Sequence, residues 1–189
     1  MSFFWDGVYV CMNCFCRLND TEDAKAANAD RILNEDTYCN SIGDVFPEDF
    51  ASRTEEEQTD YIGERSASRG VSIGFLLQFT QRFDCWRWSS AEIIRKLIKP
   101  ATQGTRCRFV ELPQMEEFTG PAKTFISYAQ AGCWGDLVAA VLDGGADHHR
   151  CVWIDIFAVR QWPSKTPDLD FASTIAHCSS FMVVCSSLK

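Results

Sequence analysis

The sequence lacks an excess of positive charge, a long hydrophobic run and a glycine-rich phosphate loop. Its 18 lysines and arginines are outnumbered by 26 aspartates and glutamates, which gives a formal net charge of −8. So negative a chain is unsuited to neutralising a row of phosphates, which argues against a nucleic-acid-binding protein. No stretch approaches the ~20 apolar residues of a membrane helix, and the amino terminus has no basic start of a secretory signal. These absences predict a cytoplasmic protein without nucleic-acid or membrane partners.

What is present fits a folded domain of ordinary composition. The chain has 189 residues, of which 46% are hydrophobic and 23% are charged. That length accommodates one domain, or one domain with an extension. The composition excludes a wholly disordered chain and a collagen-like chain. The absence of a G-x-G-x-x-G motif also removes support for a Rossmann phosphate loop.

The charge is divided unevenly along the chain. Residues 1–64 hold 15 acidic and 4 basic residues, whereas residues 65–189 hold 11 acidic and 14 basic residues. Such a break is typical of regions with different roles. We predict an acidic, largely flexible extension over 1–64, a helical lead-in with one strand over 65–119, and an α/β domain over 120–189.

Ten cysteines are the other compositional feature. Most lie inside apolar segments, where buried reduced thiols are the ordinary interpretation for a cytosolic protein. Four of the ten cysteines lie towards the amino terminus, at Cys11, Cys14, Cys16 and Cys39. Four thiolates suffice to bind zinc, although this spacing is irregular. We assign no metal ligands and keep a small zinc-binding module as an alternative.

The lead-in contains the signals of one amphipathic helix. Ser89 followed by Glu92 fits a capping box, and the apolar stripe that begins at Ile93 continues to Ile98. Pro100 is expected to stop this helix. An apolar stretch over 106–112 predicts a strand.

The last third of the sequence alternates between strand and helix patterns. Strands are predicted at 124–128, over the nearly continuous apolar run 151–159, and at 181–185. Helices are predicted at 134–141 and 167–178, from apolar residues at i, i+3, i+4 and i+7 and from N-cap signals. The order βαβαβ favours an α/β fold with a doubly wound parallel sheet.

The third predicted strand lies almost at the end of the sequence. In the flavodoxin-like order 2-1-3-4-5 this strand is interior, and its sequence FMVVC is apolar on both faces. An exposed apolar edge is normally avoided. We therefore expect a partial domain, with two further strands and their helices beyond Lys189.

Two short elements carry a family resemblance. They are Ser127-Tyr128 within FISYA followed by Trp134-Gly135, and Trp153, Asp155 and Gln161 within VWIDIFAVRQ. Their order and context resemble a TIR (Toll/interleukin-1 receptor) domain of the algal and protist type. They are also similar to fungal heterokaryon-incompatibility domains. The resemblance covers about residues 120–189.

The resemblance implies a signalling domain that cleaves NAD at the bond to nicotinamide. TIR enzymes use a glutamate on the helix after the third strand, and that position lies beyond Lys189. The chain up to Lys189 is therefore expected to be inactive as an NAD nucleosidase, with NAD as a substrate rather than a tightly bound cofactor. The alternative implied is a non-enzymatic interaction module that self-associates through residues 160–178.

Five residues are candidates for contacts with the nucleotide, and none is assigned a catalytic role. They are Tyr128, Trp134, Asp155, Arg160 and Gln161. Aromatic rings stack on a planar base, an arginine binds phosphate, and a glutamine amide donates hydrogen bonds. Two of these residues have a second interpretation. Trp134 also begins an amphipathic helix, where it would be core, and Asp155 is either a site residue or a hydrogen-bonded loop organiser.

Overall fold

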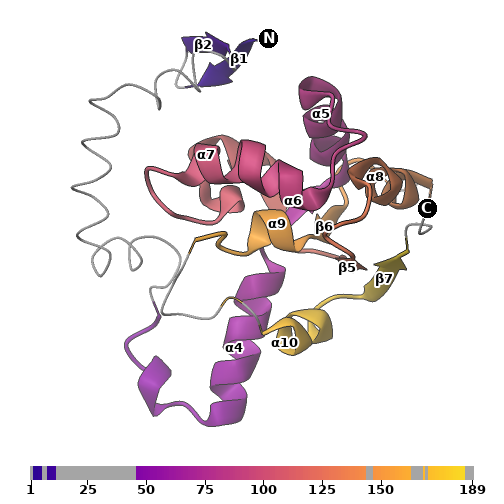
Figure 1. Cartoon of the computed structure of the whole chain (residues 1–189). Helices are drawn as coiled ribbons and strands as arrows, with labels where there is room; N and C mark the ends of the chain where they lie inside the picture. The colour runs from indigo at the N-terminus through magenta and orange to yellow at the C-terminus, as the bar shows by residue number, and fades with distance from the viewer. Residues whose placement is uncertain are drawn as a thin grey trace.

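The computed structural model describes residues 46–143, 147–162, 168 and 170–185, together with the backbone of 2–5 and 8–11. In this part of the chain the fold is α/β, with helices on both faces of one five-stranded sheet (Figure 1). Near the amino terminus, β1 (Ser2–Trp5) and β2 (Val8–Cys11) form an antiparallel hairpin. Cys14, Cys16 and Cys39 lie outside the described residues.

The strand order of the main sheet is β4-β3-β6-β5-β7. The central strand β5 (Thr124–Tyr128) pairs in parallel with β6 (Cys151–Trp153) and with β7 (Ser180–Val184). Strand β3 (Gly70–Ser72) lies antiparallel to β6 and to β4 (Thr119–Gly120). The α/β class is confirmed, and the β6-β5-β7 part is compatible with the predicted flavodoxin-like order. Strand β3, which is antiparallel to both of its neighbours, makes the sheet mixed, which was not predicted.

Helix α4 (Glu55–Ala67) runs across residue 64, where the acidic extension was predicted to end. Thr54 and Glu57 form a reciprocal capping box at its amino end, with the Thr54 N–H donating to Glu57 Oε2 at 2.8 Å. Its carboxyl end packs beneath the sheet, where the Trp153 indole donates to the Ser66 carbonyl at 3.0 Å. Thus part of the acidic region is folded onto the α/β domain.

The predicted amphipathic helix of the lead-in is present and extends further than expected. It begins with the Ser89–Glu92 capping box as α6 (Ser90–Ile93), passes through a π-turn (Ile94–Ile98) and continues as α7 (Lys99–Thr102). The prediction that Pro100 stops it is wrong. The Lys99 N–H donates to the Ile94 carbonyl, so the π-turn shifts the hydrogen bonds just before the residue that has no N–H to donate.

Two predicted strands are also corrected. The segment 106–112 forms a short 3₁₀ turn (Phe109–Glu111) followed by another (Pro113–Phe118). The apolar run 151–159 divides into β6 and helix α9 (Asp155–Ala158). A continuous apolar run does not distinguish a buried strand from a buried helical turn, and here the core encloses both.

The two faces of the sheet carry cores of unequal size. The larger core lies beneath α5 (Ile73–Phe83) and α8 (Trp134–Asp143) and is rich in aromatic rings. Its centre is Phe157, whose ring centroid lies 5.4 Å from those of Phe79 and Phe109. The smaller core lies on the face covered by α4 and α10 (Phe171–Ala176), where Phe125 stacks on Trp153 at 4.6 Å.

The last helix and strand differ in how well they follow the predictions. Helix α10 begins at Phe171, with Asp170 as its N-cap, rather than at residue 167. Strand β7 matches its prediction within one residue and lies at one end of the described sheet. Met182 and Val184 pack against the larger core, whereas Phe181 and Val183 are 50% and 58% exposed.

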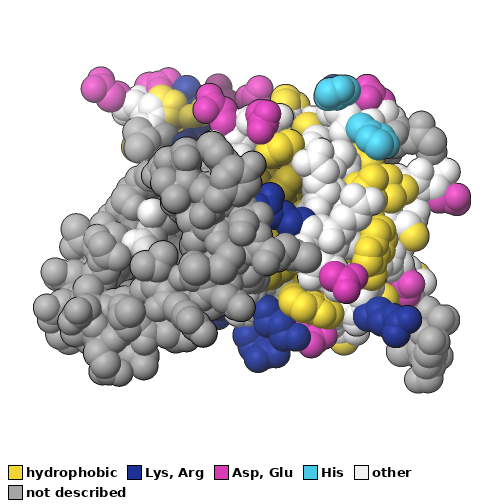
Figure 2. Space-filling view, turned by 90° about the horizontal axis from the view of Figure 1, so that it is seen from above, with side chains coloured by type: hydrophobic (Ala, Val, Ile, Leu, Met, Phe, Trp, Pro, Cys, Tyr) yellow, Lys and Arg dark blue, Asp and Glu magenta, His cyan; other side chains and the backbone are white. Residues whose placement is uncertain are grey.

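A membrane span needs a helix that is both long and apolar. None of the helices in the described ranges combines the length and the apolar character that crossing a bilayer requires. Seen from above, apolar side chains reach the surface in separate groups between polar ones (Figure 2).

Candidate functional site

The carboxyl edge of the parallel strands is the natural place for a ligand. The chain leaves β5, returns on one side as β6 and then on the other side as β7. Connections that leave a central strand in opposite directions open a crevice outside its carboxyl end. The candidate site is therefore the end of β5 at Tyr128, between the ends of β6 and β7.

A polar cluster occupies this edge. The Tyr128 hydroxyl donates to Asp155 Oδ1 at 2.5 Å, and the Gln130 amide reaches Asp155 Oδ2 at 3.4 Å. Burial raises the pKa of Tyr128 well above its usual value, and the neighbouring Asp155 carboxylate raises it further. Tyr128 is therefore a permanent hydrogen-bond donor to this carboxylate, and we call Tyr128, Gln130 and Asp155 the polar cluster.

Gln161 adjoins the cluster and closes the short helix beside it. Its amide nitrogen donates to the backbone carbonyls of Asp155 at 3.2 Å and of Val159 at 3.1 Å. These bonds fix α9, which begins at Asp155 directly after β6. The structure thus brings together three of the five predicted site residues, Tyr128, Asp155 and Gln161.

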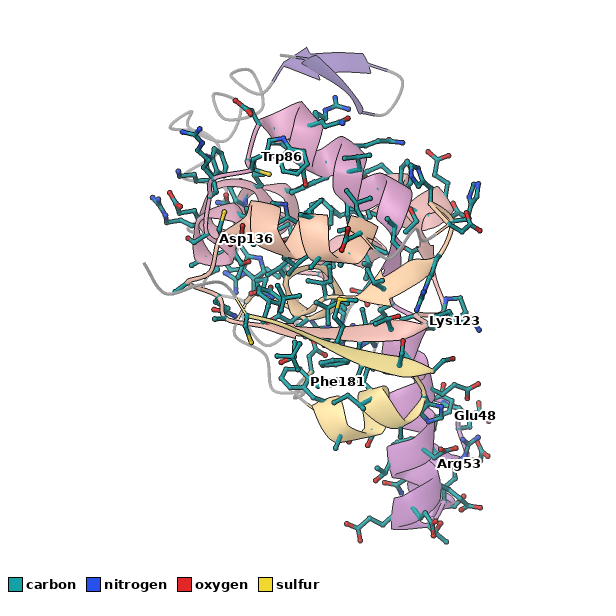
Figure 3. All side chains as sticks on the ribbon, turned by 90° about the vertical axis from the view of Figure 1, so that its right-hand side faces the viewer. Glu48, Arg53, Trp86, Lys123, Asp136 and Phe181 are labelled. Atoms are coloured by element: carbon teal, nitrogen blue, oxygen red, sulfur yellow. The ribbon has the colours of Figure 1, made fainter. Side chains whose placement is uncertain are left out.

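Trp134 lies in the larger core rather than at the crevice. It is fully buried, its indole donates to Thr80 Oγ1 at 2.9 Å, and its ring packs 5.9 Å from Phe157. The glycine beside it is also structural, because a Cβ on Gly135 would lie 2.5 Å from the Trp86 carbonyl oxygen. The Trp-Gly pair therefore anchors the start of α8. Figure 3 shows Trp86 and Asp136, a residue in the first turn of α8, on the same side of the molecule.

Arg160 belongs to a different arrangement. It is 7% exposed, and its backbone N–H donates to Asp168 Oδ2 at 2.8 Å. Asp168 also accepts hydrogen bonds from Nε and Nη2 of the Arg108 guanidinium, whose Nη1 donates to Glu111 Oε1 at 2.6 Å. We call Arg108, Glu111 and Asp168 the buried ion-pair network. It pins the loop after α9 to the 3₁₀ turn at 109–111.

Two single residues and one ion pair were missed by sequence reasoning. Gln130 follows the FISYA element by one residue, and its position after a strand was an available signal. Ser90 was predicted only as part of a helix cap, yet its hydroxyl is fully buried beside Tyr128 and lacks a hydrogen-bond partner of good geometry within the described residues. The pairing of Arg108 with Asp168 spans 60 residues. No local sequence pattern predicts such a contact.

The cysteines and acidic residues of the described part offer no metal centre. No group of three or more His, Cys, Asp or Glu side chains there is placed to hold a metal ion. The six cysteines in this part are free thiols, and burial raises the pKa of Cys85 to about 12. The zinc alternative concerned the amino-terminal cysteines, whose side chains lie outside the described residues.

The arrangement places a carboxylate, which accepts hydrogen bonds, next to a neutral phenol and two amides. It is suited to binding hydroxyl or carboxamide groups, because none of the ion pairs between described residues involves Asp155.

A scan of protein-family models and searches of curated proteins and solved structures find no match to this chain.

Proposed function

We propose that the α/β domain is a TIR-like nucleotide-binding unit that binds NAD at the carboxyl edge of β5 and β7. The observation that carries the proposal is the parallel order β6-β5-β7, which opens a crevice at the end of β5. The polar cluster lies at this position. Signalling through bound nucleotide is the role that we propose for the domain.

The chemistry of the cluster favours the hydroxyl-rich and amide-rich parts of NAD. Asp155 Oδ1 is committed to the Tyr128 hydroxyl, whereas Oδ2 has only the long 3.4 Å contact with Gln130. A ribose hydroxyl or the nicotinamide carboxamide would donate to Oδ2. Tyr128 would hold the carboxylate in place for that bond, which reduces the ordering needed on binding.

Cleavage of NAD is a separate step, and we assign no residue of 1–189 to it. The resemblance places the attacking glutamate after the third strand, and Asp155 is engaged by a phenol and an amide. We therefore propose that the residues of the polar cluster bind NAD without cleaving it.

An NMR titration of the 189-residue protein with NAD, ADP-ribose and nicotinamide tests the proposal. We expect chemical-shift changes centred on Tyr128, Gln130 and Asp155, and no release of nicotinamide. Asp155→Asn and Tyr128→Phe should each weaken binding at least tenfold, the size of one lost charge-assisted hydrogen bond.

The matched control is Asp143→Asn, which removes an exposed carboxylate at the other end of α8. Its affinity should equal that of the wild type. Absence of any shift at millimolar NAD in a folded sample would contradict the proposal, as would an equal loss in all three variants.

A second function, self-association through residues 160–178, is favoured by one observation. Phe171 at the start of α10 is 36% exposed and adjoins Phe125 and Trp153 of the smaller core, at ring distances of 6.0 and 5.6 Å. An apolar contact of this kind would persist at high salt, since screening weakens charges only. Phe171→Ser should abolish such association in sedimentation experiments, with Phe46→Ser as the aromatic control.

A further inference from the structure

The helix over residues 90–102 is buried on one side and basic on the other. Ile93 and Ile98 of its apolar stripe are 0% and 1% exposed. Around it, residues 82–106 contain six basic and two acidic residues. Arg87 and Arg95 are exposed and Lys96 and Lys99 are partly exposed. We call these four residues the basic helix face.

Two tryptophans hold the lysines of this face in position. Lys96 Nζ lies 4.2 Å from the centre of the Trp88 ring, and Lys99 Nζ lies 5.4 Å from that of Trp162. The Trp162 indole is itself anchored, because it donates to Thr102 Oγ1 at 2.9 Å. Cation–π contacts keep an ammonium group ordered without neutralising its charge. Lys96 also pairs with Glu92 Oε1 at 2.9 Å, so the positive charge of the face comes mainly from Arg87, Arg95 and Lys99. The basic helix face is therefore a preorganised surface for an anionic partner.

The amino-terminal half of α4 carries the opposite charge. Residues 48–64 contain seven acidic residues and one basic residue, Arg53, which is already paired with Asp49 at 3.1 Å. Glu55, Glu56 and Asp60 are exposed and line an open hollow of about 630 Å³ between α4 and α10. We call these three residues the acidic end of α4.

The two surfaces do not meet within one molecule. Helix α4 extends away from the sheet, and α6 and α7 lie beyond its opposite end (Figure 1). Its 13 residues correspond to a length of about 20 Å. Figure 3 shows the same separation, with Trp86 at one end of the molecule and Glu48 and Arg53 at the other. Only a second copy can bring an acidic end of α4 to a basic helix face.

We propose that the basic helix face docks onto the acidic end of α4 of a second copy of this chain, head to tail. Charge complementarity between two described surfaces selects this occupant. Such an interface is heterologous, so each copy keeps one surface available and the chains lengthen with concentration. Exposed charges are screened within about 10 Å at 0.1 M salt, so the association should be strongest at low ionic strength. The proposal is independent of NAD binding.

Sedimentation velocity at 50 and 500 mM NaCl tests the proposal on the full chain. The wild type should sediment faster as its concentration rises at low salt, and this dependence should disappear at high salt. Lys96→Glu/Lys99→Glu and Glu55→Lys/Glu56→Lys should each remain monomeric, with at least tenfold weaker association. A matched charge reversal at the exposed Glu116 and Glu117, Glu116→Lys/Glu117→Lys, should associate like the wild type.

An equimolar mixture of the two charge-reversed variants is the decisive sample. One variant keeps its acidic end and the other keeps its basic face, so the mixture should associate at low salt although each variant alone stays monomeric. Restored association also shows that both variants are folded.

Three results would overturn the proposal. These are a monomeric wild type at low salt, a mixture of the two variants that fails to associate, and carbodiimide cross-links that join Lys96 or Lys99 to acids of the same chain other than Glu92, which already pairs with Lys96 at 2.9 Å. The last would show that the chain's own acidic residues occupy the basic helix face. An NAD titration that fails while the mixture associates would refute only the proposed function.

Discussion

Asp155 and Asp168 lie on either side of one loop, and their carboxylates have different kinds of hydrogen-bond partner. The Asp168 side chain is 6% exposed and accepts hydrogen bonds from Nε and Nη2 of Arg108 and from the Arg160 backbone N–H. Asp155 is half-buried and has a neutral phenol and amides as partners. A carboxylate that is bound by cations stabilises the fold, whereas one that is held by neutral donors can still accept a hydrogen bond from a ligand. This difference separates the buried ion-pair network from the polar cluster.

The largest expected effect comes from breaking the buried ion-pair network. Arg108→Met would leave the carboxylates of Glu111 and Asp168 buried without their main cation, which costs about 3–5 kcal/mol of unfolding free energy. Urea unfolding followed by tryptophan fluorescence measures this loss. The exposed Arg87→Met is the control and should change stability by less than ~0.5 kcal/mol. A loss below ~1 kcal/mol for Arg108→Met would show that the network contributes little.

The next effect tests whether the Trp-Gly element is structural. Gly135→Ala would place a Cβ 2.5 Å from a backbone oxygen, which forces the start of α8 to shift. Overpacking of this kind costs about 1–3 kcal/mol. Gly74→Ala, where the nearest heavy atom is 3.3 Å away, is the control in helix α5. The Tyr128–Asp155 pair should keep its NMR signals in both variants, and its loss in Gly135→Ala alone would link the element to the site.

Much of the α/β domain could be predicted because its signals are local. Strand β5 has the predicted bounds, and α8 places Trp134, Leu137, Val138 and Val141 in the core at the predicted spacing. The run 151–159 could not be divided correctly, because a strand and a helical turn buried on all sides have the same apolar composition. The helix past Pro100 was missed because proline was expected to end it, whereas a π-turn just before Pro100 shifts the hydrogen bonds.

The candidate site was predictable in part for the same reason. Tyr128 and Asp155 come together because parallel strands place their carboxyl ends at one edge, which the βαβ pattern implies. Arg160 was assigned to phosphate on residue type alone, while its backbone N–H contacts Asp168. That contact depends on where Arg108 lies, and such tertiary pairing is absent from the sequence pattern.

A smaller effect on stability is expected from the Tyr128 hydroxyl. It depends on pH and so distinguishes the polar cluster from the buried ion-pair network. Tyr128→Phe removes one hydrogen bond to a carboxylate, and the expected cost at pH 7 is about 1–2 kcal/mol. Because the folded pKa of Tyr128 lies above its unfolded value, its contribution is complete below pH ~10 and is lost as the pH rises further.

Unfolding of the wild type and of Tyr128→Phe between pH 7 and 11 measures this dependence. The difference between the two proteins should shrink above pH ~10, since only the wild type loses stability through this group. Tyr61→Phe, at a surface position on α4, should follow the wild type. A constant difference across the range would place the Tyr128 hydroxyl in contact with solvent.

The smallest effect concerns a third carboxylate, Glu92, whose side chain is 40% exposed. The Ser89 N–H and then Lys96 lower its pKa from 4.5 to about 2, so its stabilising effect is present above pH ~4.5 and is lost as the pH falls toward 2. Glu92→Gln should lower the Tm slightly at pH 7 and not at pH 2, with Glu116→Gln unchanged at both. Solvent screening makes this effect smaller than those of Asp168 and Asp155. A Tm loss at pH 7 as large as that of Arg108→Met would show that burial does not decide which carboxylate stabilises this fold.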